Sequence, residues 1–250
     1  MDFTVKKYTE LLQALIKKNY NFQTFDEFLR TPKNKTIVLR HDVDLMPENS
    51  LKFAEIQHQN GVKGVYYFRA VKESWDERII KKISDMGHEI GYHYENLTFC
   101  KGNYEDAIND FEDNLTKLRK LAPVSTICMH GSPMSKFDSK DLWKKVDYKD
   151  FGIIGEPYFD IDFNDVYYLT DTGRRWDGNK VSVRDKVNTN YKLSLSTTND
   201  IIQSIIKEEF PNQIMFTFHP QRWNDNYFYW IKELIFQKFK NLVKRLLYVK

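Results

Sequence analysis

The sequence is poor in cysteine, in linker-like stretches and in long apolar runs. Its 250 residues include two cysteines, Cys100 and Cys128, which are too few for a disulfide framework and lack the spacing of metal ligands, so we expect reduced thiols. No stretch rich in Pro, Gly and Ser divides the chain, and we therefore expect one domain over residues 1–250. No apolar run follows the basic residues near the start, which predicts neither a secretory signal nor a membrane-spanning helix and favours a cytoplasmic protein.

Most of the chain lacks an excess of either charge, and the net positive charge is concentrated at its end. The formal net charge is +3, yet residues 222–250 hold seven Lys or Arg against two acids, so the body is nearly neutral and the tail is basic. Because the body is not basic and no base-reading motif occurs, we do not expect nucleic acid as a partner. Aromatic residues make up 15% of the chain, which favours rings that line a cleft as well as a core.

Segments with strand-like and helix-like patterns alternate along the chain. This succession predicts an α/β fold with a parallel sheet, enough strands for a closed or nearly closed barrel, and chemistry at the C-terminal strand ends. The predicted strands lie within residues 35–44 and at 62–69, 88–95, 124–130, 151–154, 166–170 and 214–219. The predicted helices are two short ones within 4–30, then 48–60, 75–86, 104–121, 138–146, 199–210 and 227–250.

The end of the first of these strands places two carboxylates side by side. In an extended segment, alternate residues share a face, so Asp42 and Asp44 converge while His41 points the other way. Two close carboxylates repel each other unless a cation or a shared proton separates them, and a divalent metal is the commonest solution. The alternative for Asp44 is a helix cap, because a helical pattern follows it.

Histidines follow several of the later strands. His93 and Glu95 lie at the end of the third strand, His130 at the end of the fourth and His219 at the end of the last. A lone histidine at a strand end is usually a structural hydrogen-bonding group, and it is the convergence of several that favours a site. A metal held by Asp and His, with open positions for water, is typical of hydrolytic sites.

Four segments carry a resemblance to a known family. They are Arg40–Asp44, Gly87–Glu95, Met129–Pro133 and Phe218–Trp223, and in this order and spacing they resemble the polysaccharide deacetylase family. This is carbohydrate esterase family 4, with the NodB-homology domain, and the similar branch is associated with bacterial surface-polysaccharide gene clusters. The resemblance covers about residues 35–223 and implies a distorted (β/α)7 barrel that removes acetyl from an N-acetylated sugar or glycan with the help of a metal.

The resemblance also implies roles for single residues. Asp42 corresponds to the family's catalytic base, Asp44 and His93 to metal ligands, and His219 to the histidine that protonates the leaving amine. The implied cofactor is a divalent metal, with Zn²⁺ favoured.

One position departs from the family pattern. The second metal-binding histidine of the family is replaced by Leu97, which cannot bind a metal. Either Glu95 or His130 could take its place, and we favour His130 because a neutral imidazole suits zinc.

The segment between the sixth and seventh strands predicts substrate contacts. Guanidinium groups bind carboxylate or phosphate in a bidentate manner and an indole ring stacks on a sugar, so Arg174, Arg175 and Trp176 suit an anionic or sugar-nucleotide-like ligand. An internal ion pair, Arg184 with Asp185 or Arg174 with Asp171, is the structural alternative. The predicted substrate-binding residues are Glu95, Tyr158, Arg174, Trp176, Arg222 and Trp223.

Two segments flank the predicted barrel, namely the N-terminal helices within residues 1–30 and a basic amphipathic helix over 226–250. The C-terminal helix has large apolar residues along one face, including Ile231, Leu234, Ile235, Leu242, Leu246 and Leu247. It could contact an anionic membrane surface or simply cover the barrel, and both alternatives stay open.

Two other functions remain open at this stage. The loss of a histidine at position 97 is compatible with a catalytically degenerate barrel that binds glycans. A metal-dependent amidase that hydrolyses another C–N bond would use the same ligands.

Overall fold

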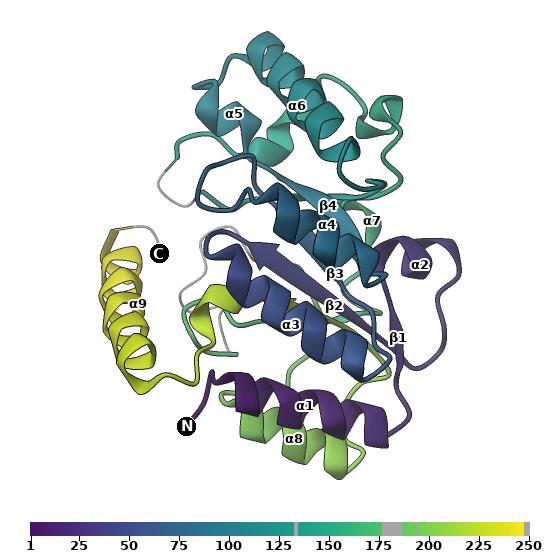
Figure 1. Ribbon diagram of the computed structural model, residues 1–250, viewed down its shortest axis with the longest axis vertical. Coiled ribbons are helices and arrows are strands. Elements are labelled where there is room, and N and C mark those ends of the chain that lie inside the picture. Colours follow the sequence, from purple (N-terminus) through teal and green to yellow (C-terminus); the bar gives the residue numbers. More distant parts are fainter. Residues whose placement is uncertain (133–134, 177–186, 194, 248–250) are drawn as a thin grey trace.

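The computed structural model describes residues 1–132, 135–176, 187–193 and 195–247. Helices cover a central sheet, and α9 lies along one side of the body (Figure 1). The strands are β1 (Asn21–Gln23), β2 (Thr36–Val43), β3 (Val65–Phe68), β4 (Glu89–Tyr94), β5 (Ile127–Met129), β6 (Tyr167–Thr170) and β7 (Gln213–Phe218). The α-helices are α1 (Val5–Lys17), α2 (Phe25–Arg30), α3 (Pro47–Gln59), α4 (Glu77–Asp85), α5 (Asn96–Phe99), α6 (Tyr104–Arg119), α7 (Pro157–Asp160), α8 (Thr198–Ile206) and α9 (Tyr227–Leu247). Short 3₁₀ turns occur at Ser139–Lys144, Tyr148–Phe151 and Pro220–Arg222.

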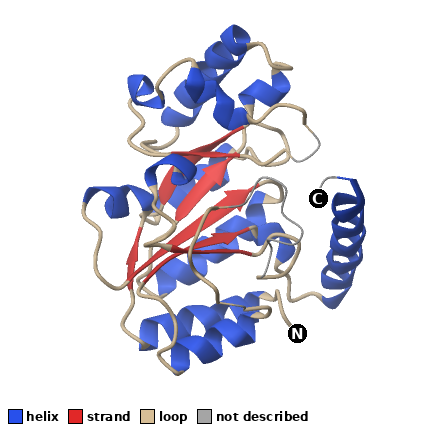
Figure 2. Ribbon diagram, turned by 180° about the vertical axis from the view of Figure 1, so that it is seen from behind, coloured by secondary structure: helices blue, strands red, loops and turns tan. Residues whose placement is uncertain are grey.

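The seven strands form one parallel sheet in the order β5-β4-β3-β2-β7-β6, with β1 paired to β2 beside this path. The strands lie side by side with helices outside them, as the view from behind shows (Figure 2). Because β5 and β6 stand at the two ends of this order and do not pair with each other among the described residues, the curled sheet is a half barrel and not a closed one. The predicted α/β class with a distorted barrel is confirmed, although the sheet is more open than the closed or nearly closed barrel that the number of strands predicted.

One predicted strand was wrong. Residues 151–154 make no ladder, because Gly152 has a φ of 70° at the end of a 3₁₀ turn and only an isolated bridge, Thr126 to Gly155, follows. The seventh strand is instead β1, which lies within the segment where two short helices were predicted. It is only three residues long and has no alternating pattern of its own.

The two faces of β2 have different chemistry. Every residue of β2 is buried, and Ile37 and Leu39 pack in the large core under the helices. His41 shares that face, and its ring stacks on Tyr66 with centroids 4.1 Å apart. Burial lowers the pKa of His41 to about 3, so this histidine is a neutral core residue. The predicted orientation of His41, away from the two carboxylates, is confirmed.

The other face of β2 lines the interior of the half barrel. Val38 belongs to a second apolar cluster there, with Val65 and Met215 from the neighbouring strands. Arg40 and Asp42 follow at alternate positions, so the interior changes from apolar to ionic towards the C-terminal end of the strand.

Close packing inside the half barrel depends on one glycine of β4. A Cβ at Gly91 would lie 2.3 Å from the ring of Tyr67, so only glycine leaves room for this ring. The Tyr67 ring thereby fills the interior below the strand ends, and its centroid lies 6.4 Å from that of His93.

Most predicted helices are present with small shifts of their ends. α6 begins at the Asn103 cap, whose side chain accepts from the amides of Glu105 and Asp106, and α8 begins with a capping box at Thr197. Within the described part of the chain, no helix has the length and apolar character needed to cross a bilayer. The predicted end of the last helix, residues 248–250, lies outside the described residues.

Candidate active site

The acidic pair and two histidines meet at the C-terminal ends of β2, β4 and β5. The Nε2 atom of His93 lies 3.7 Å from Asp42 Oδ2 and 3.6 Å from Asp44 Oδ1. His130 Nε2 lies 3.5 Å from the same Asp44 Oδ1. Ligand atoms of Asp44, His93 and His130 all lie within 4.8 Å of one another. The structure thus brings together the three residues that the sequence predicts as metal ligands.

These three residues fit a divalent metal. Asp44 Oδ1 is buried and has no hydrogen-bond partner among the described residues, which is costly unless a cation neutralises it. Burial alone would raise the pKa of Asp44, but the imidazoles of His93, His130 and His219 outweigh it and hold the pKa well below its ordinary value. One carboxylate and two imidazoles are a typical ligand set for zinc, with positions left open for water.

Both histidines are oriented through their second ring nitrogen. His93 Nδ1 donates to the carbonyl oxygen of Cys128 at 2.9 Å, and His130 Nδ1 donates to Glu95 Oε2 at 2.8 Å. Because neither acceptor can donate a proton in return, each Nε2 is left with its lone pair towards Asp44. The hydrogen bonds therefore set both imidazoles in the tautomer that binds a metal.

Glu95 supports His130. Arg69 Nε donates to Glu95 Oε1 at 2.5 Å, and the Ser132 hydroxyl donates to Glu95 Oε2 at 3.0 Å. Burial would raise the pKa of Glu95, but the hydrogen bond from His130 and the charge of Arg69 lower it to about 2. Both of its oxygens are engaged within the protein, and its substrate-binding role stays a prediction. Leu97, at the position where the family pattern has a histidine, is buried in the core.

Asp42 is held by an arginine of its own strand. Arg40 Nε and Nη2 donate to the two oxygens of Asp42 at 2.8 and 2.7 Å, and both side chains are almost fully buried. The Tyr158 ring lies over the guanidinium, 5.2 Å from Arg40 Cζ. Arg40 and Asp42 are two residues apart on β2 and share its inner face, so the strand itself sets this bidentate geometry.

His219 approaches the other carboxylate oxygen of Asp44 and is itself paired with an acid. Its Nδ1 donates to Asp171 Oδ1 at 2.6 Å, while its Nε2 lies 3.9 Å from Asp44 Oδ2. Asp171 also accepts from Trp223 Nε1 at 2.7 Å and from Arg222 Nη1 at 2.9 Å. Burial would raise the pKa of Asp171, but His219 and Arg222 lower it. The sequence analysis gave Asp171 only a structural role, although its place just after β6 is the signal that could have revealed it.

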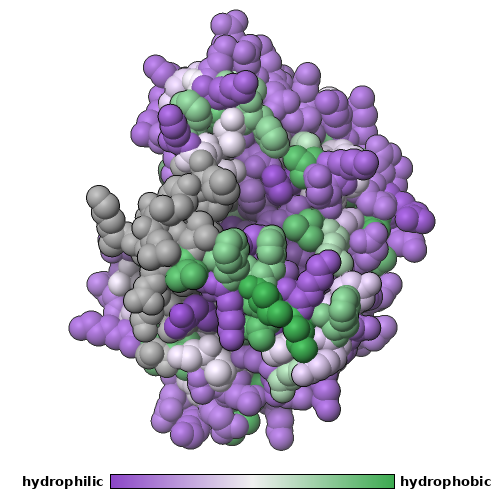
Figure 3. Space-filling model, turned by 90° about the vertical axis from the view of Figure 1, so that its left-hand side faces the viewer, coloured by the Kyte–Doolittle hydropathy of each residue, from purple (hydrophilic) through white to green (hydrophobic). Residues whose placement is uncertain are grey.

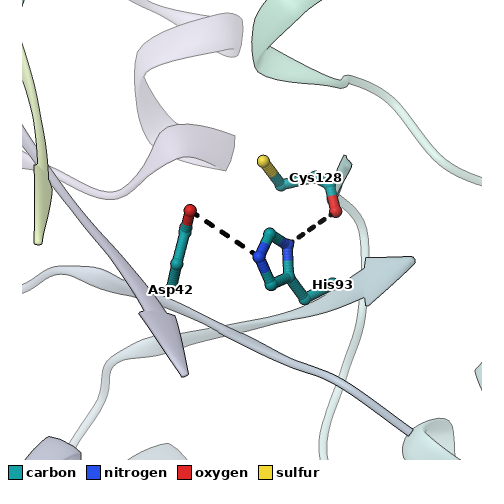
Figure 4. Close-up of side chains that lie close together, drawn as sticks. All are labelled: Asp42, His93 and Cys128. Atoms are coloured by element: carbon teal, nitrogen blue, oxygen red, sulfur yellow. Dashed lines mark hydrogen bonds and ion pairs between the residues drawn. The ribbon is translucent and has the colours of Figure 1, made fainter. Parts of the chain in front are cut away.

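Cys128 lies unexpectedly near the same site. Ligand atoms of Asp42, His93 and Cys128 also lie within 4.8 Å of one another, and Figure 4 shows the Asp42 carboxylate facing the His93 ring with Cys128 beside it. The spacing of the cysteines gave no reason to expect this. The Asp44 set is better suited to a cation, because both oxygens of Asp42 already accept from Arg40.

The other predicted substrate-binding residues have partners within the protein, and their roles stay predictions. Trp176 and Trp223 are 4% and 1% exposed and pack against Phe218, which does not favour stacking of their rings on a sugar. Arg174 is 8% exposed and donates to the carbonyl of Trp230, while Arg222 is the partner of Asp171. The side chains of Arg184 and Asp185 lie outside the described residues.

A scan of protein-family models and a search of curated proteins find no match to this chain. Similar solved structures are carbohydrate esterases of family 4. A Streptococcus mutans esterase of this family has a TM-score of 0.46 and 14% identity, over 95% of this chain and 92% of that one. A Bacillus subtilis family 4 carbohydrate esterase has a TM-score of 0.40 and 14% identity, over 92% and 84% of the two chains.

A third similar structure is described as a pseudoenzyme. It is a family 4 protein from Bacillus anthracis, with a TM-score of 0.44 and 17% identity over 86% of this chain. This chain spans less than two thirds of that protein's length, namely 63%.

Proposed function

We propose that the protein is a metal-dependent hydrolase that removes the acetyl group from an N-acetylated sugar or glycan precursor in bacterial surface-polysaccharide synthesis. The observation that carries the proposal is the convergence of Asp44, His93 and His130. Two buried pairs lie next to these residues, namely the ion pair of Arg40 with Asp42 and the hydrogen-bonded pair of His219 with Asp171. The acetylated sugar as substrate rests on the resemblance of the sequence motifs.

Asp44, His93 and His130 would hold the divalent metal, for which we favour Zn²⁺. When bound, such an ion lowers the pKa of water and polarises a carbonyl oxygen. Asp42 is the general base that accepts a proton from the attacking water, and Arg40 fixes the direction of its carboxylate.

His219 is the general acid for the leaving amine. Its Nδ1 is fixed by Asp171, so its Nε2 faces the site and can give a proton to the leaving group. The products are acetate and a free amine. The base and the acid therefore come from two adjacent strands, Asp42 from β2 and His219 from the end of β7.

Metal content and product analysis test the proposal. We expect the purified protein to contain one divalent ion per chain by mass spectrometry of metals, and His93→Ala to lose it. His58→Ala is the matched control, because His58 is exposed on α3 away from the site. Asp42→Asn and His219→Ala should keep the ion and lose acetate release from N-acetylated sugar oligomers by about 10²- to 10⁴-fold.

Two results would replace this function with another. A protein that holds no metal and releases no acetate, yet binds the oligomers, would be a glycan-binding barrel. Release of ammonia without acetate would identify an amidase that acts on another C–N bond.

A further inference from the structure

The outer face of α9 is unusually apolar for an exposed helix. Phe228, Ile235, Phe239 and Leu242 are spaced by seven, four and three residues and therefore share one face. They are 71%, 63%, 64% and 55% exposed, and Phe236 beside them is 50% exposed. Figure 3 looks at the side of the molecule on which α9 lies and shows hydrophobic side chains gathered amid hydrophilic ones. Single exposed apolar residues are ordinary, but a contiguous stripe of this kind marks a contact surface.

The inner face of α9 fixes the direction in which this stripe points. Trp230 Nε1 donates to the carbonyl of Asp2 at 2.7 Å, and Arg174 Nη1 donates to the carbonyl of Trp230 at 2.8 Å. Further along the helix, Asn241 Nδ2 donates to the carbonyl of Gly173 at 3.0 Å. Because α9 is attached to the body through these residues, the stripe cannot turn inward without breaking the contacts.

The charges of α9 favour one kind of partner. The helix carries five Lys or Arg and one Glu, and Lys232 and Lys238 are exposed beside the stripe. A second copy would bring an equally basic helix against this one, which is repulsive. An anionic lipid surface instead satisfies both features, because the apolar stripe can enter the lipid while the lysines contact the anionic headgroups.

We propose that the outer face of α9 docks the protein on an anionic membrane surface, with the helix lying in the interface. The stripe that we infer differs in part from the face that the sequence predicts. Ile231 and Leu234 are half-buried, whereas Phe228 and Phe239 are exposed, and the side chains of Leu246 and Leu247 lie outside those described.

One loop connects α9 to the site. The loop that α9 contacts through Gly173 and Arg174 also holds Asp171, the partner of His219. This step rests on the proposed function, and it assigns the substrate to sugars carried on a lipid anchor.

Vesicle flotation of the full chain tests the docking without any substrate. Vesicles of equal parts phosphatidylcholine and phosphatidylglycerol should carry the protein, and vesicles of phosphatidylcholine alone should carry much less. The combined variant Phe228→Ser, Ile235→Ser and Phe239→Ser should bind at least about tenfold more weakly, because these side chains are those that enter the lipid. Circular dichroism and the unfolding midpoint should stay unchanged, since all three are exposed.

A control variant removes three exposed apolar residues elsewhere, each about half exposed. Phe99→Ser, Phe159→Ser and Ile206→Ser, which lie on α5, on α7 and at the end of α8, should leave vesicle binding intact. Lys232→Glu and Lys238→Glu should each weaken binding to the anionic vesicles about fivefold or more, and rising salt should do the same.

Three outcomes would overturn the proposal. The first is that the unchanged protein does not bind anionic vesicles. The second is that the two serine variants lose vesicle binding equally. The third is that the protein sediments as a dimer and the α9 variant as a monomer. Acetate release from soluble N-acetylated sugar oligomers is measured separately, so loss of the proposed function and loss of membrane docking are distinguishable.

Discussion

The hydrogen bond from His130 to Glu95 allows a sharp test of the metal site. In Glu95→Gln, one carboxylate oxygen becomes an NH₂ group. If that group faces His130 Nδ1, the ring must carry its proton on Nε2 and can no longer bind a metal. If the NH₂ group faces Arg69 instead, it points its hydrogens at another donor, Arg69 Nε. In the unchanged protein this nitrogen donates to a Glu95 oxygen at 2.5 Å. Either arrangement weakens the ligand.

The expected loss of metal affinity follows from this geometry. Removing the partner that orients a ligating histidine typically costs 10- to 100-fold in metal affinity, or about 1.4 to 2.7 kcal/mol. Competition with a chromophoric chelator at neutral pH measures the dissociation constant directly and requires no substrate. Glu112→Gln, an exposed position on α6, is the matched control and should leave the affinity unchanged.

A double-variant cycle separates positioning from general damage. If Glu95 acts through His130, the Glu95→Gln change should have little further effect in a His130→Ala background. Unchanged affinity in Glu95→Gln, or the same loss with and without His130, would refute the reasoning.

Three further perturbations have defined outcomes. Arg40→Met should lower the free energy of unfolding by about 3–5 kcal/mol in urea titrations, because it leaves the buried Asp42 unpaired. Adding Asp42→Asn should restore part of this loss. If it restores nothing, the ion-pair argument is contradicted. Asp171→Asn should reduce kcat about 10²-fold or more with unchanged metal content, since His219 loses the carboxylate that fixes its ring; a change in KM alone would speak against this role. Burial lowers the pKa of His88 to about 4, so the protein should lose stability as the pH falls from about 6.5 towards 4. The stability difference between the unchanged protein and His88→Gln should therefore shrink by about 2 kcal/mol between pH 7 and pH 5, and a constant difference would disprove the shift.

The parts of the site that the sequence predicted depend on strand periodicity. Asp42 and Asp44 converge because alternate residues of an extended segment share a face, and His93 and His130 join them because parallel strands end at one edge. The sequence also indicated that His130 stands in for the missing ligand at Leu97. The structure adds the reason, since β4 and β5 are adjacent strands of the sheet.

Other features could not be predicted, because they depend on which side of a loop faces inward. Trp176 follows β6 in a segment without periodicity, and only tertiary packing places it among Phe216 and Phe218 instead of in a cleft. The wrongly predicted strand at 151–154 and the missed strand β1 have a different cause, which is their short length. A few residues carry too little pattern to set a strand before the neighbouring chain is in place.

Arg40 gives the two carboxylates of β2 different tasks. Asp42 and Asp44 approach the same nitrogen of His93, at 3.7 and 3.6 Å, and without compensation they would compete for one cation. The guanidinium below them neutralises Asp42 through both oxygens and leaves Asp44 with the buried oxygen that has no hydrogen-bond partner among the described residues. Asp44 is therefore the carboxylate suited to a metal, and Asp42 is held beside it in a fixed direction, as a general base requires. The division of roles follows from the order of side chains along one strand, in which Val38, Arg40 and Asp42 occupy successive inward positions.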